Sequence, residues 1–418
     1  MTTSPKTMIG AAIGLIGIIA GAAFLVGHRP SRPVGTTPDG LAARTILDRC
    51  SNRPKPERND CYQEAIQARL TEVGVGGAMG LLQAMARAEP EVERDGHVFA
   101  HGIGIDGYLA AQEVAGPFGQ CTIDFASGCN HGVIQAYLES QDAVDSAAVN
   151  ALCAPYRTAG DSRFHLFQCV HGMGHGFQMM YAGDLPKALG SCGLLADGWD
   201  RESCYGGAFM ENIIHAIAPH HPATKLVESH HHEPEGAPPF KALDSTDLLY
   251  PCLIMEPKFR RPCYEIQTSA ILHFTQNDIA KTAEACATAP EDMQPICFAS
   301  LGRDISSRAR RDPAKAIRYC KRGGDHHVGW CYFGVAKALI DWGADPVTGI
   351  AMCRRLGDSP GWELCYQGVG EQVANLIPDR DQRIRVCEQA ERPEAVKVCR
   401  TSAATLPPET FRTDTLKS

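Results

Sequence analysis

A histidine followed by a glycine occurs three times in the first half of the chain, at His101, His131 and His171. The third copy is followed by His175, four positions further on. Residues four apart lie on one face of an α-helix, which is the spacing at which two imidazoles bind one metal ion. Imidazole is a common ligand of zinc and copper. These four histidines therefore predict a copper or zinc site, provided that neighbouring helices bring the three segments together.

Two carboxylates near these motifs, Asp106 and Glu211, are candidates for catalytic work. Either could act as a metal ligand, as the partner that orients a histidine, or as a general base. The alternative for each is a carboxylate that caps a helix or faces solvent. We expect a structural role for His97, although it lies near enough to the first motif to remain a candidate.

A second histidine-rich segment spans about residues 215–240 and contains six of the sixteen histidines of the chain. They are His215, His220, His221, His230, His231 and His232. A flexible tract of this composition can capture zinc, copper or nickel. The alternative is an exposed loop without a specific role.

The composition argues against nucleic acid as a partner. The net charge is −8, the isoelectric point is about 6.1 and only 7% of the residues are aromatic, so neither a basic face nor a stacking platform is indicated. The chain also contains no GxSxG, HExxH or CxxCH motif, no Walker loop and no dinucleotide-binding fingerprint. The sequence therefore leaves open whether the protein is an enzyme.

The eighteen cysteines sort into nine consecutive pairs along the chain. The pairs are Cys50 with Cys61, Cys121 with Cys129, Cys153 with Cys169, Cys192 with Cys204, Cys252 with Cys263, Cys286 with Cys297, Cys320 with Cys331, Cys353 with Cys365, and Cys387 with Cys399. Seven of the nine pairs have a sequence separation of 11 or 12, and no CxxC pair typical of a metal ribbon is present. This usage predicts nine disulfides and an oxidising compartment, which leaves no thiol nucleophile.

The second cysteines of the last five pairs recur with a constant period of 34 in the numbering. Such self-similarity predicts a solenoid of two-helix units, and this period equals the length of a tetratricopeptide unit. Aspartates recur at nearly the same period, at Asp278, Asp312, Asp345 and Asp379. An aspartate N-cap, followed by proline in two of the four cases, opens a helix. Each predicted disulfide then clamps the turn between two helices.

Two cysteine separations depart from this period, and they determine the number of repeat units. The separation of Cys61 and Cys129 is 68, twice the period, so a unit without cysteines is expected between them. The separation of Cys204 and Cys263 is 59, which exceeds one period by 25 and places an insertion in the histidine-rich segment. Without this excess, the segment 41–405 makes ten units of one period each. The sequence predicts an all-α domain over 41–405, a solenoid or toroid of about ten two-helix repeats.

The histidine of the motif is not shared by all units. The corresponding later positions hold Gly206, Glu265, Ala299, Phe333, Gln367 and Thr401. A residue that only serves the packing of the repeat would recur in every unit, so restriction to three adjacent units favours a site. A structural histidine that donates to a loop carbonyl remains the alternative.

This cysteine register resembles the Sel1-like and tetratricopeptide class of helical repeats, which includes cysteine-rich secreted members with a disulfide in each hairpin. The resemblance covers most of the chain. It concerns architecture only, because the sequence does not show the tetratricopeptide motif of Trp, Leu-Gly and Tyr at fixed offsets. It implies a helical array and assigns no functional residues.

The N-terminus predicts attachment to a membrane. Met8 to Gly27 is a run of twenty residues without a charge, which matches the roughly 20 residues needed to cross a bilayer. We expect a signal anchor over 1–28, a linker over 29–40 and a C-terminal tail over 406–418, with a cleaved signal peptide as the alternative. The cysteines place the repeat domain on the periplasmic or extracytoplasmic side of an inner membrane.

Three functions fit these features. The first is a membrane-anchored periplasmic metalloprotein that holds copper or zinc, with a metalloenzyme as its catalytic version in which Asp106 or Glu211 manages protons. The second is an interaction scaffold that binds a protein partner on the surface of the repeats. The third is a haem protein with histidine ligands.

Overall fold

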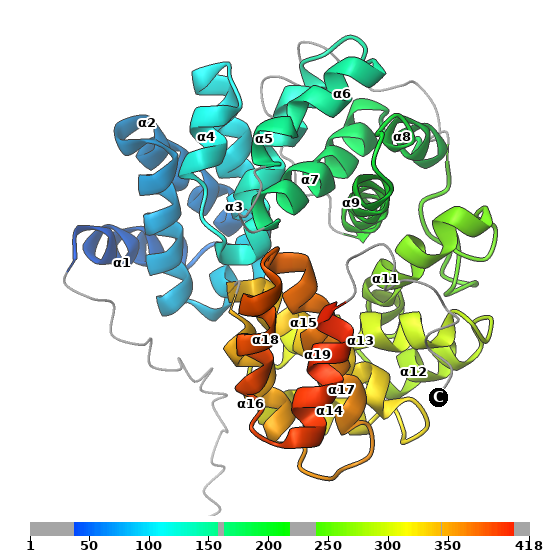
Figure 1. Ribbon diagram of the computed structural model, residues 1–418. Coiled ribbons are helices and arrows are strands. Elements are labelled where there is room, and N and C mark those ends of the chain that lie inside the picture. The colour runs from blue at the N-terminus through cyan, green and yellow to red at the C-terminus, as the bar shows by residue number, and fades with distance from the viewer. Residues whose placement is uncertain (1–36, 158–162, 218–239, 344, 405–418) are drawn as a thin grey trace, which may run out of the picture.

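The computed structural model describes residues 37–157, 163–217, 240–343 and 345–404, and these residues form helices and no strand. The predicted all-α class is therefore confirmed (Figure 1). The helices are α1 (Pro38–Cys50), α2 (Lys55–Ala88), α3 (Pro90–Ala111), α4 (Ala115–Gln120), η1 (Asp124–Ser127), α5 (Gly128–Glu139), α6 (Ser146–Leu152), η2 (Ala154–Tyr156), α7 (Phe164–Met180), α8 (Leu185–Cys192), α9 (Gly198–Ile217), α11 (Pro257–Phe274), α12 (Ile279–Ala287), α13 (Gln294–Arg308), α14 (Pro313–Lys321), α15 (Val328–Gly343), α16 (Pro346–Arg354), α17 (Trp362–Leu376), α18 (Arg380–Glu388) and α19 (Pro393–Ala404).

All nine predicted disulfides are present, in the predicted pairing. They join Cys50 to Cys61, Cys121 to Cys129, Cys153 to Cys169, Cys192 to Cys204, Cys252 to Cys263, Cys286 to Cys297, Cys320 to Cys331, Cys353 to Cys365, and Cys387 to Cys399. Cys192, at the end of α8, and Cys204, in the second turn of α9, show the common arrangement. Closing a loop of this length stabilises the fold by about 3 kcal/mol in the chain-entropy model. The disulfides thus fix helix pairs, and helical repeats are the architecture of the described chain.

The predicted aspartate caps are also confirmed. Asp278, Asp312, Asp345 and Asp379 are the N-caps of α12, α14, α16 and α18, and each side chain accepts a hydrogen bond from a backbone N–H of the first turn. A side-chain oxygen at this position satisfies a donor that the helix itself leaves unpaired. The same local signal therefore starts four successive outer helices.

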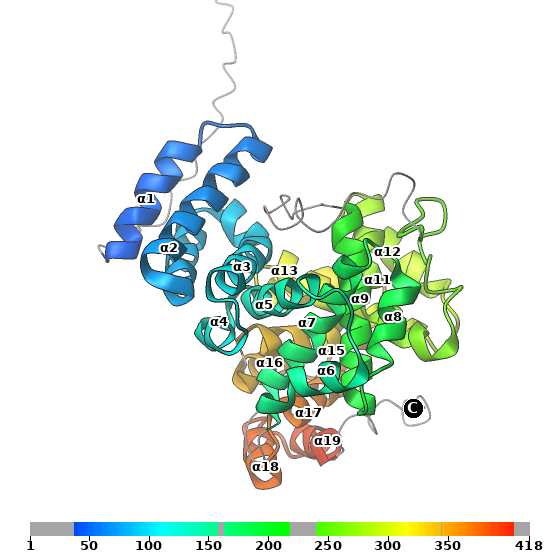
Figure 2. The same ribbon diagram turned by 90° about the horizontal axis from the view of Figure 1, so that it is seen from above.

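The long helices form an inner layer and the short helices an outer layer. The helices α3, α5, α7 and α9 pack each against the next, and α11, α13, α15 and α17 continue the series. All eight contribute side chains to one central cavity, whereas α4, α6, α8, α12, α14, α16 and α18 contribute none among the described residues. Figure 2 shows α3, α5 and α7 side by side in this inner layer.

The unit without cysteines is built from a broken helix. Gly74 interrupts α2 with φ 75° and ψ −178°, so the second half of α2 becomes the outer partner of α3. Glycine adopts this left-handed φ without the steric cost that a Cβ would add. The break thus divides α2 into the second helix of the first unit and the first helix of the unit without cysteines.

The inner layer curves until two distant parts of the chain meet. Arg311, in the loop after α13, forms a 2.7 Å ion pair with Glu93 of α3, and α15 packs against η1. The contact joins residues 218 positions apart in the sequence. The central cavity is therefore lined by early and late helices together.

Parts of the predicted domain plan lie outside the described residues. They include the signal anchor over 1–28, the tail over 406–418 and all of the histidine-rich insertion between 218 and 239. The helix α1 begins at Pro38, inside the stretch predicted as a linker, because Thr37 caps it and accepts a hydrogen bond from Gly40. Within the described ranges, no helix is both long and apolar enough to cross a bilayer.

Candidate metal centre

Five imidazoles from three neighbouring inner helices meet in the interior of the protein. They belong to His97 and His101 of α3, His131 of α5, and His171 and His175 of α7. The ring of His131 is the hub, because its centroid lies 5.0 to 5.7 Å from the centroids of the four others. The four histidines that the motif singled out are therefore brought together.

Three of these side chains provide a compact set of ligand atoms. One ring nitrogen from each of His97, His101 and His131 lies within 4.8 Å of the others. His97, for which a structural role was expected beside the motif, is brought into this set as well. The signal that could have found it is its spacing, because His97 and His101 are four positions apart on α3, just as His171 and His175 are on α7.

The hydrogen bonds around the cluster fix which ring nitrogen carries the proton. The Nδ1–H of His97 donates to the carbonyl oxygen of Phe125 at 2.7 Å, and that of His171 donates to the carbonyl oxygen of Ser203 at 3.1 Å. A carbonyl oxygen only accepts, so the proton sits on Nδ1 and the lone pair on Nε2. Two histidines are thus held in one tautomer by the backbone.

Two more histidines are fixed by side chains. The Nε2–H of His131 donates to Oε1 of Gln168 at 2.7 Å, and the Nδ1–H of His175 donates to Oε2 of Glu211 at 2.8 Å. The opposite nitrogens, Nδ1 of His131 and Nε2 of His175, are buried without a hydrogen-bond partner among the described residues. Metal-binding histidines nearly always donate their second nitrogen in this way, to a carboxylate or a carbonyl.

Burial keeps two of the imidazoles neutral, those of His131 and His171. The pKa values of His131 and His171 lie well below the ordinary 6.5, first because burial penalises the charged ring and then because His175 lies beside both. A neutral imidazole has the lone pair that a metal ion requires. At pH 7 these two side chains therefore need not lose a proton before they bind a cation.

Glycines set the distance between the inner helices. A Cβ on Gly132 would collide with the carbonyl oxygen of His101, and a Cβ on Gly207 with that of His171. The same relationship recurs away from the histidines, where Gly334 faces the carbonyl oxygen of Ala299. The glycine after the motif position is therefore a feature of helix packing, whereas the histidine is confined to the cluster.

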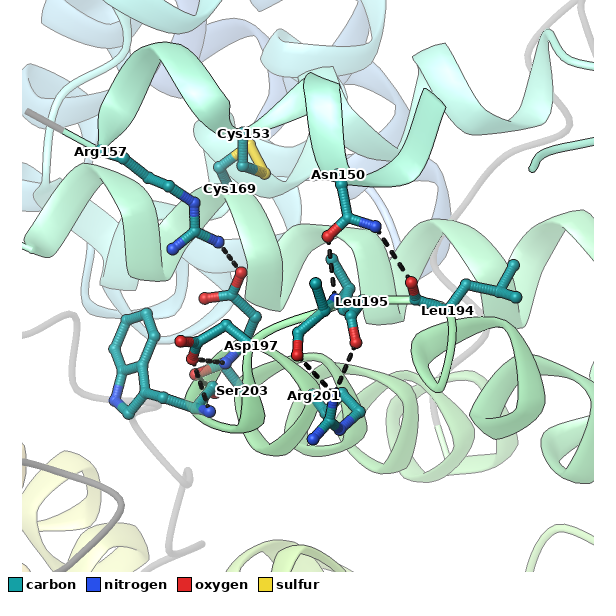
Figure 3. A network of polar contacts seen from close by, with 12 residues as sticks. Asn150, Cys153, Arg157, Cys169, Leu194, Leu195, Asp197, Arg201 and Ser203 are labelled. Carbon is teal, nitrogen blue, oxygen red and sulfur yellow. Dashed lines mark hydrogen bonds and ion pairs between the residues drawn. A yellow bond between two sulfur atoms is a disulfide. The ribbon is translucent and has the colours of Figure 1, made fainter. Parts of the chain in front are cut away.

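The start of α9 is fixed by a polar network that Figure 3 shows. Asp197 accepts hydrogen bonds from the backbone N–H groups of Trp199 and Asp200, and Arg157 forms an ion pair with the buried carboxylate of Asp200. The side chain of Arg201 donates to the carbonyl oxygen of Leu195 at 2.7 Å. This network holds the helix that supplies the Ser203 carbonyl and Glu211.

The two predicted carboxylates have different surroundings. Glu211 is fully buried and contacts the cluster through His175. Asp106 instead makes its hydrogen bond with Gln67 of α2, and burial raises its pKa to about 6. The structure therefore brings Glu211 to the histidines and places Asp106 against a neighbouring helix.

The cluster forms part of the wall of the central cavity, whose volume is about 790 Å³. His97, His131 and His171 line the cavity, while His101 and His175 lie behind them and are 1% and 0% exposed. A metal ion among these rings would have protein on one side and the cavity on the other. This is the arrangement of a site with an open coordination position.

The fold and the cluster define an all-helical, disulfide-linked repeat protein with a buried histidine centre. Comparison with known proteins finds no matching family model, no matching curated protein and no matching solved structure.

Proposed function

We propose that the protein binds a transition metal, copper or zinc, at the histidine cluster. The observation that supports this most strongly is the pair of buried ring nitrogens, Nδ1 of His131 and Nε2 of His175, that have no hydrogen-bond partner among the described residues. An unsatisfied buried polar group costs about 1–3 kcal/mol, which a metal–nitrogen bond would offset. Two such nitrogens in one histidine cluster are difficult to explain by packing alone.

The ligand set that we propose consists first of His97, His101 and His131, with His175 and His171 next to them. Three imidazoles and an open position suit zinc or copper(II). Glu211 is the partner that orients His175, and the open position faces the cavity. We also propose a catalytic version of the site, in which Glu211 accepts a proton.

The test is metal content after purification of the repeat domain and incubation with zinc or copper. We expect stoichiometric metal in the wild type and its loss in His131→Gln, because His131 lies beside all four other rings. The control is the double variant His326→Ala and His327→Ala, whose ring centroids are 4.2 Å apart but lie outside the cluster. Equal metal content in wild type and H131Q, both folded by circular dichroism, would refute the proposal.

Haem finds less support as the cofactor. Two axial imidazoles must leave space for a macrocycle between them, whereas the rings of His131 and His175 are stacked at 17° with centroids 5.0 Å apart. An absorption spectrum of the protein incubated with haemin separates the two cases. A Soret shift that disappears in H131Q would favour haem.

We also propose that the described chain is an array of ten units, outside the cytoplasm and anchored by its N-terminus. Nine disulfides support an oxidising compartment. The break at Gly74 supports the count, because it supplies the one unit that lacks cysteines. Protease protection of the domain in intact cells, followed by its loss after the outer membrane is opened, tests this location.

A further inference from the structure

The cavity beside the histidine cluster is positively charged. Its lining includes eight arginine and lysine side chains against six aspartates and glutamates. Burial, and then the nearby charge of Glu265, raise the pKa of one of the six, Glu202, to about 7. The excess of positive charge along a concave wall favours an anionic occupant.

One arginine of the lining is held in place for such an occupant. The Nε and Nη2 groups of Arg303 donate to Oδ1 of Asp304 at 3.1 and 2.7 Å, and Nη2 also donates to Oγ of Ser269 at 2.8 Å. Asp304 is fixed in turn by Thr268, which donates to its Oδ2 at 2.9 Å. The side chain of Arg303 is therefore rigid before any ligand binds, which reduces the entropy lost on binding.

The remaining guanidinium nitrogen is available to the cavity. Nη1 of Arg303 has no hydrogen-bond partner among the described residues, and the side chain, which lines the cavity, is 27% exposed. His171 of α7 lines the same cavity. Arg303 and His171 thus face the same space from different helices.

Aromatic side chains form the apolar part of the same space. Phe167 stacks on the ring of His171 with centroids 5.2 Å apart, and the indole of Trp199 lies 6.1 Å from Phe167. Trp330 lines the cavity as well, on α15. The cavity that Arg303 lines therefore also offers aromatic contacts to the apolar body of a ligand.

We infer that the cavity binds a small organic anion, with its carboxylate or phosphate group on Nη1 of Arg303 and its apolar body against Phe167 and Trp199. The inference deepens the proposed function and rests on it in one respect: the anion would be the ligand or substrate that is presented to the metal centre. Binding of the anion itself requires only the cavity and Arg303.

The experiment measures anion binding to the metal-free repeat domain by tryptophan fluorescence. Three of the four tryptophans of the chain, Trp199, Trp330 and Trp342, line the cavity, so an occupant changes their emission. The probes are benzoate and phenyl phosphate, which distinguish carboxylate from phosphate, and the uncharged benzamide. We expect saturable binding of at least one anion, at least tenfold tighter than benzamide.

The variant that tests the site is Arg303→Gln, which keeps hydrogen-bonding atoms near Asp304 and Ser269. We expect it to weaken anion binding at least tenfold, to leave benzamide binding unchanged and to retain the metal content of the wild type. The matched control is Arg385→Gln on α18, an exposed arginine outside the cavity, which should bind like the wild type.

The outcomes separate this inference from the proposed function. Loss of metal in H131Q together with equal affinities for benzoate, phenyl phosphate and benzamide would overturn the inference alone. Anion binding that depends on Arg303 in a protein that takes up no metal would overturn the proposed function alone. If R303Q does not fold, a competition experiment on the wild type tests the inference instead. Inorganic phosphate should displace bound benzoate or phenyl phosphate and should leave bound benzamide in place. If phosphate does not displace the bound anion, the inference is overturned.

Discussion

The imidazoles of His131 and His175 stack in the protein interior with their ring centroids 5.0 Å apart. They come from adjacent inner helices, and each donates one N–H to a fixed acceptor, Gln168 for the first and Glu211 for the second. The two nitrogens that remain are buried and carry lone pairs. Two buried lone pairs in one cluster can be satisfied by a cation, whereas the interior of a protein normally pairs such groups with hydrogen bonds.

Glu211→Gln is expected to separate the metal site from the stability of the fold. The carboxylate orients the ring of His175, and loss of such a partner lowers metal affinity by about 10- to 100-fold. The same change removes a buried charge, so the metal-free variant should unfold at the same temperature as the wild type or higher. Metal titration and thermal melts of the metal-free protein measure the two effects.

The control for this variant is Glu388→Gln on α18, where the carboxylate is 53% exposed and pairs with Arg400. It should change neither the affinity for metal nor the melting temperature, because an exposed ion pair contributes about 0–1 kcal/mol. An unchanged metal affinity in E211Q would assign Glu211 a role in packing only.

Gly132→Ala and Gly334→Ala form a matched pair. Each added Cβ collides with a carbonyl oxygen of the neighbouring inner helix, that of His101 in the first case and that of Ala299 in the second. Both variants should lose about 1–3 kcal/mol of stability, as overpacked interiors do. Only G132A should also lose metal affinity, because it alone moves a helix that carries a ligand.

Denaturant unfolding and metal titration of both variants check this prediction. Equal loss of metal affinity in G132A and G334A would mean that the affinity follows global stability and not the spacing of α3 and α5. Wild-type affinity in G132A would contradict the ligand set that includes His101 and His131.

The cysteine register was sufficient to predict much of the fold and part of the site. A constant period of 34 in the numbering identifies the units, and the same register places His101, His131 and His171 at equivalent positions, so their convergence follows from stacking. The N-cap at Asp312 could be predicted from the local sequence alone, because capping depends only on the neighbouring residues.

The remaining features depend on how each helix is rotated and where the backbone turns. His97 gains its role from the carbonyl of Phe125, in a turn where Phe125, Ala126 and Ser127 all have φ between 51° and 57°, and such a turn of non-glycine residues has no sequence signature. Asp106 lies only five positions beyond His101, yet helical rotation turns it toward Gln67 of α2.

Removing disulfides at two places should have different consequences for the site. Replacing Cys192 and Cys204 by serine loosens the turn that leads into α9, which carries Glu211, whereas replacing Cys387 and Cys399 affects the last helix pair. Each change should cost about 3 kcal/mol of stability. We expect metal affinity to fall only for the first pair, because local opening is confined to the affected unit.

Metal titration of both double variants under non-reducing conditions checks this. Equal affinities in the two proteins would show that the position of α9 does not depend on its disulfide. Retention of native affinity after full reduction of the wild type would contradict the prediction more strongly.

Glu202 should make the stability of the protein depend on pH between about 4.5 and 7. Burial, and then the charge of Glu265, raise the pKa of Glu202 from the ordinary 4.5 to about 7. The folded protein therefore binds this proton more tightly than the unfolded chain. Its contribution to stability is fully present below pH 4.5 and is lost as the pH rises through about 7.

Glu202→Gln removes this ionisation, so its stability should not fall over the same range. Relative to the wild type, its free energy of unfolding should increase by about 1 kcal/mol between about pH 5 and pH 8, a value reduced from the full shift because the side chain borders the cavity. Urea unfolding across this range measures the difference, with E388Q as the control whose curve should run parallel to the wild type. A constant difference between E202Q and wild type at every pH would mean that Glu202 is solvated like an ordinary surface carboxylate.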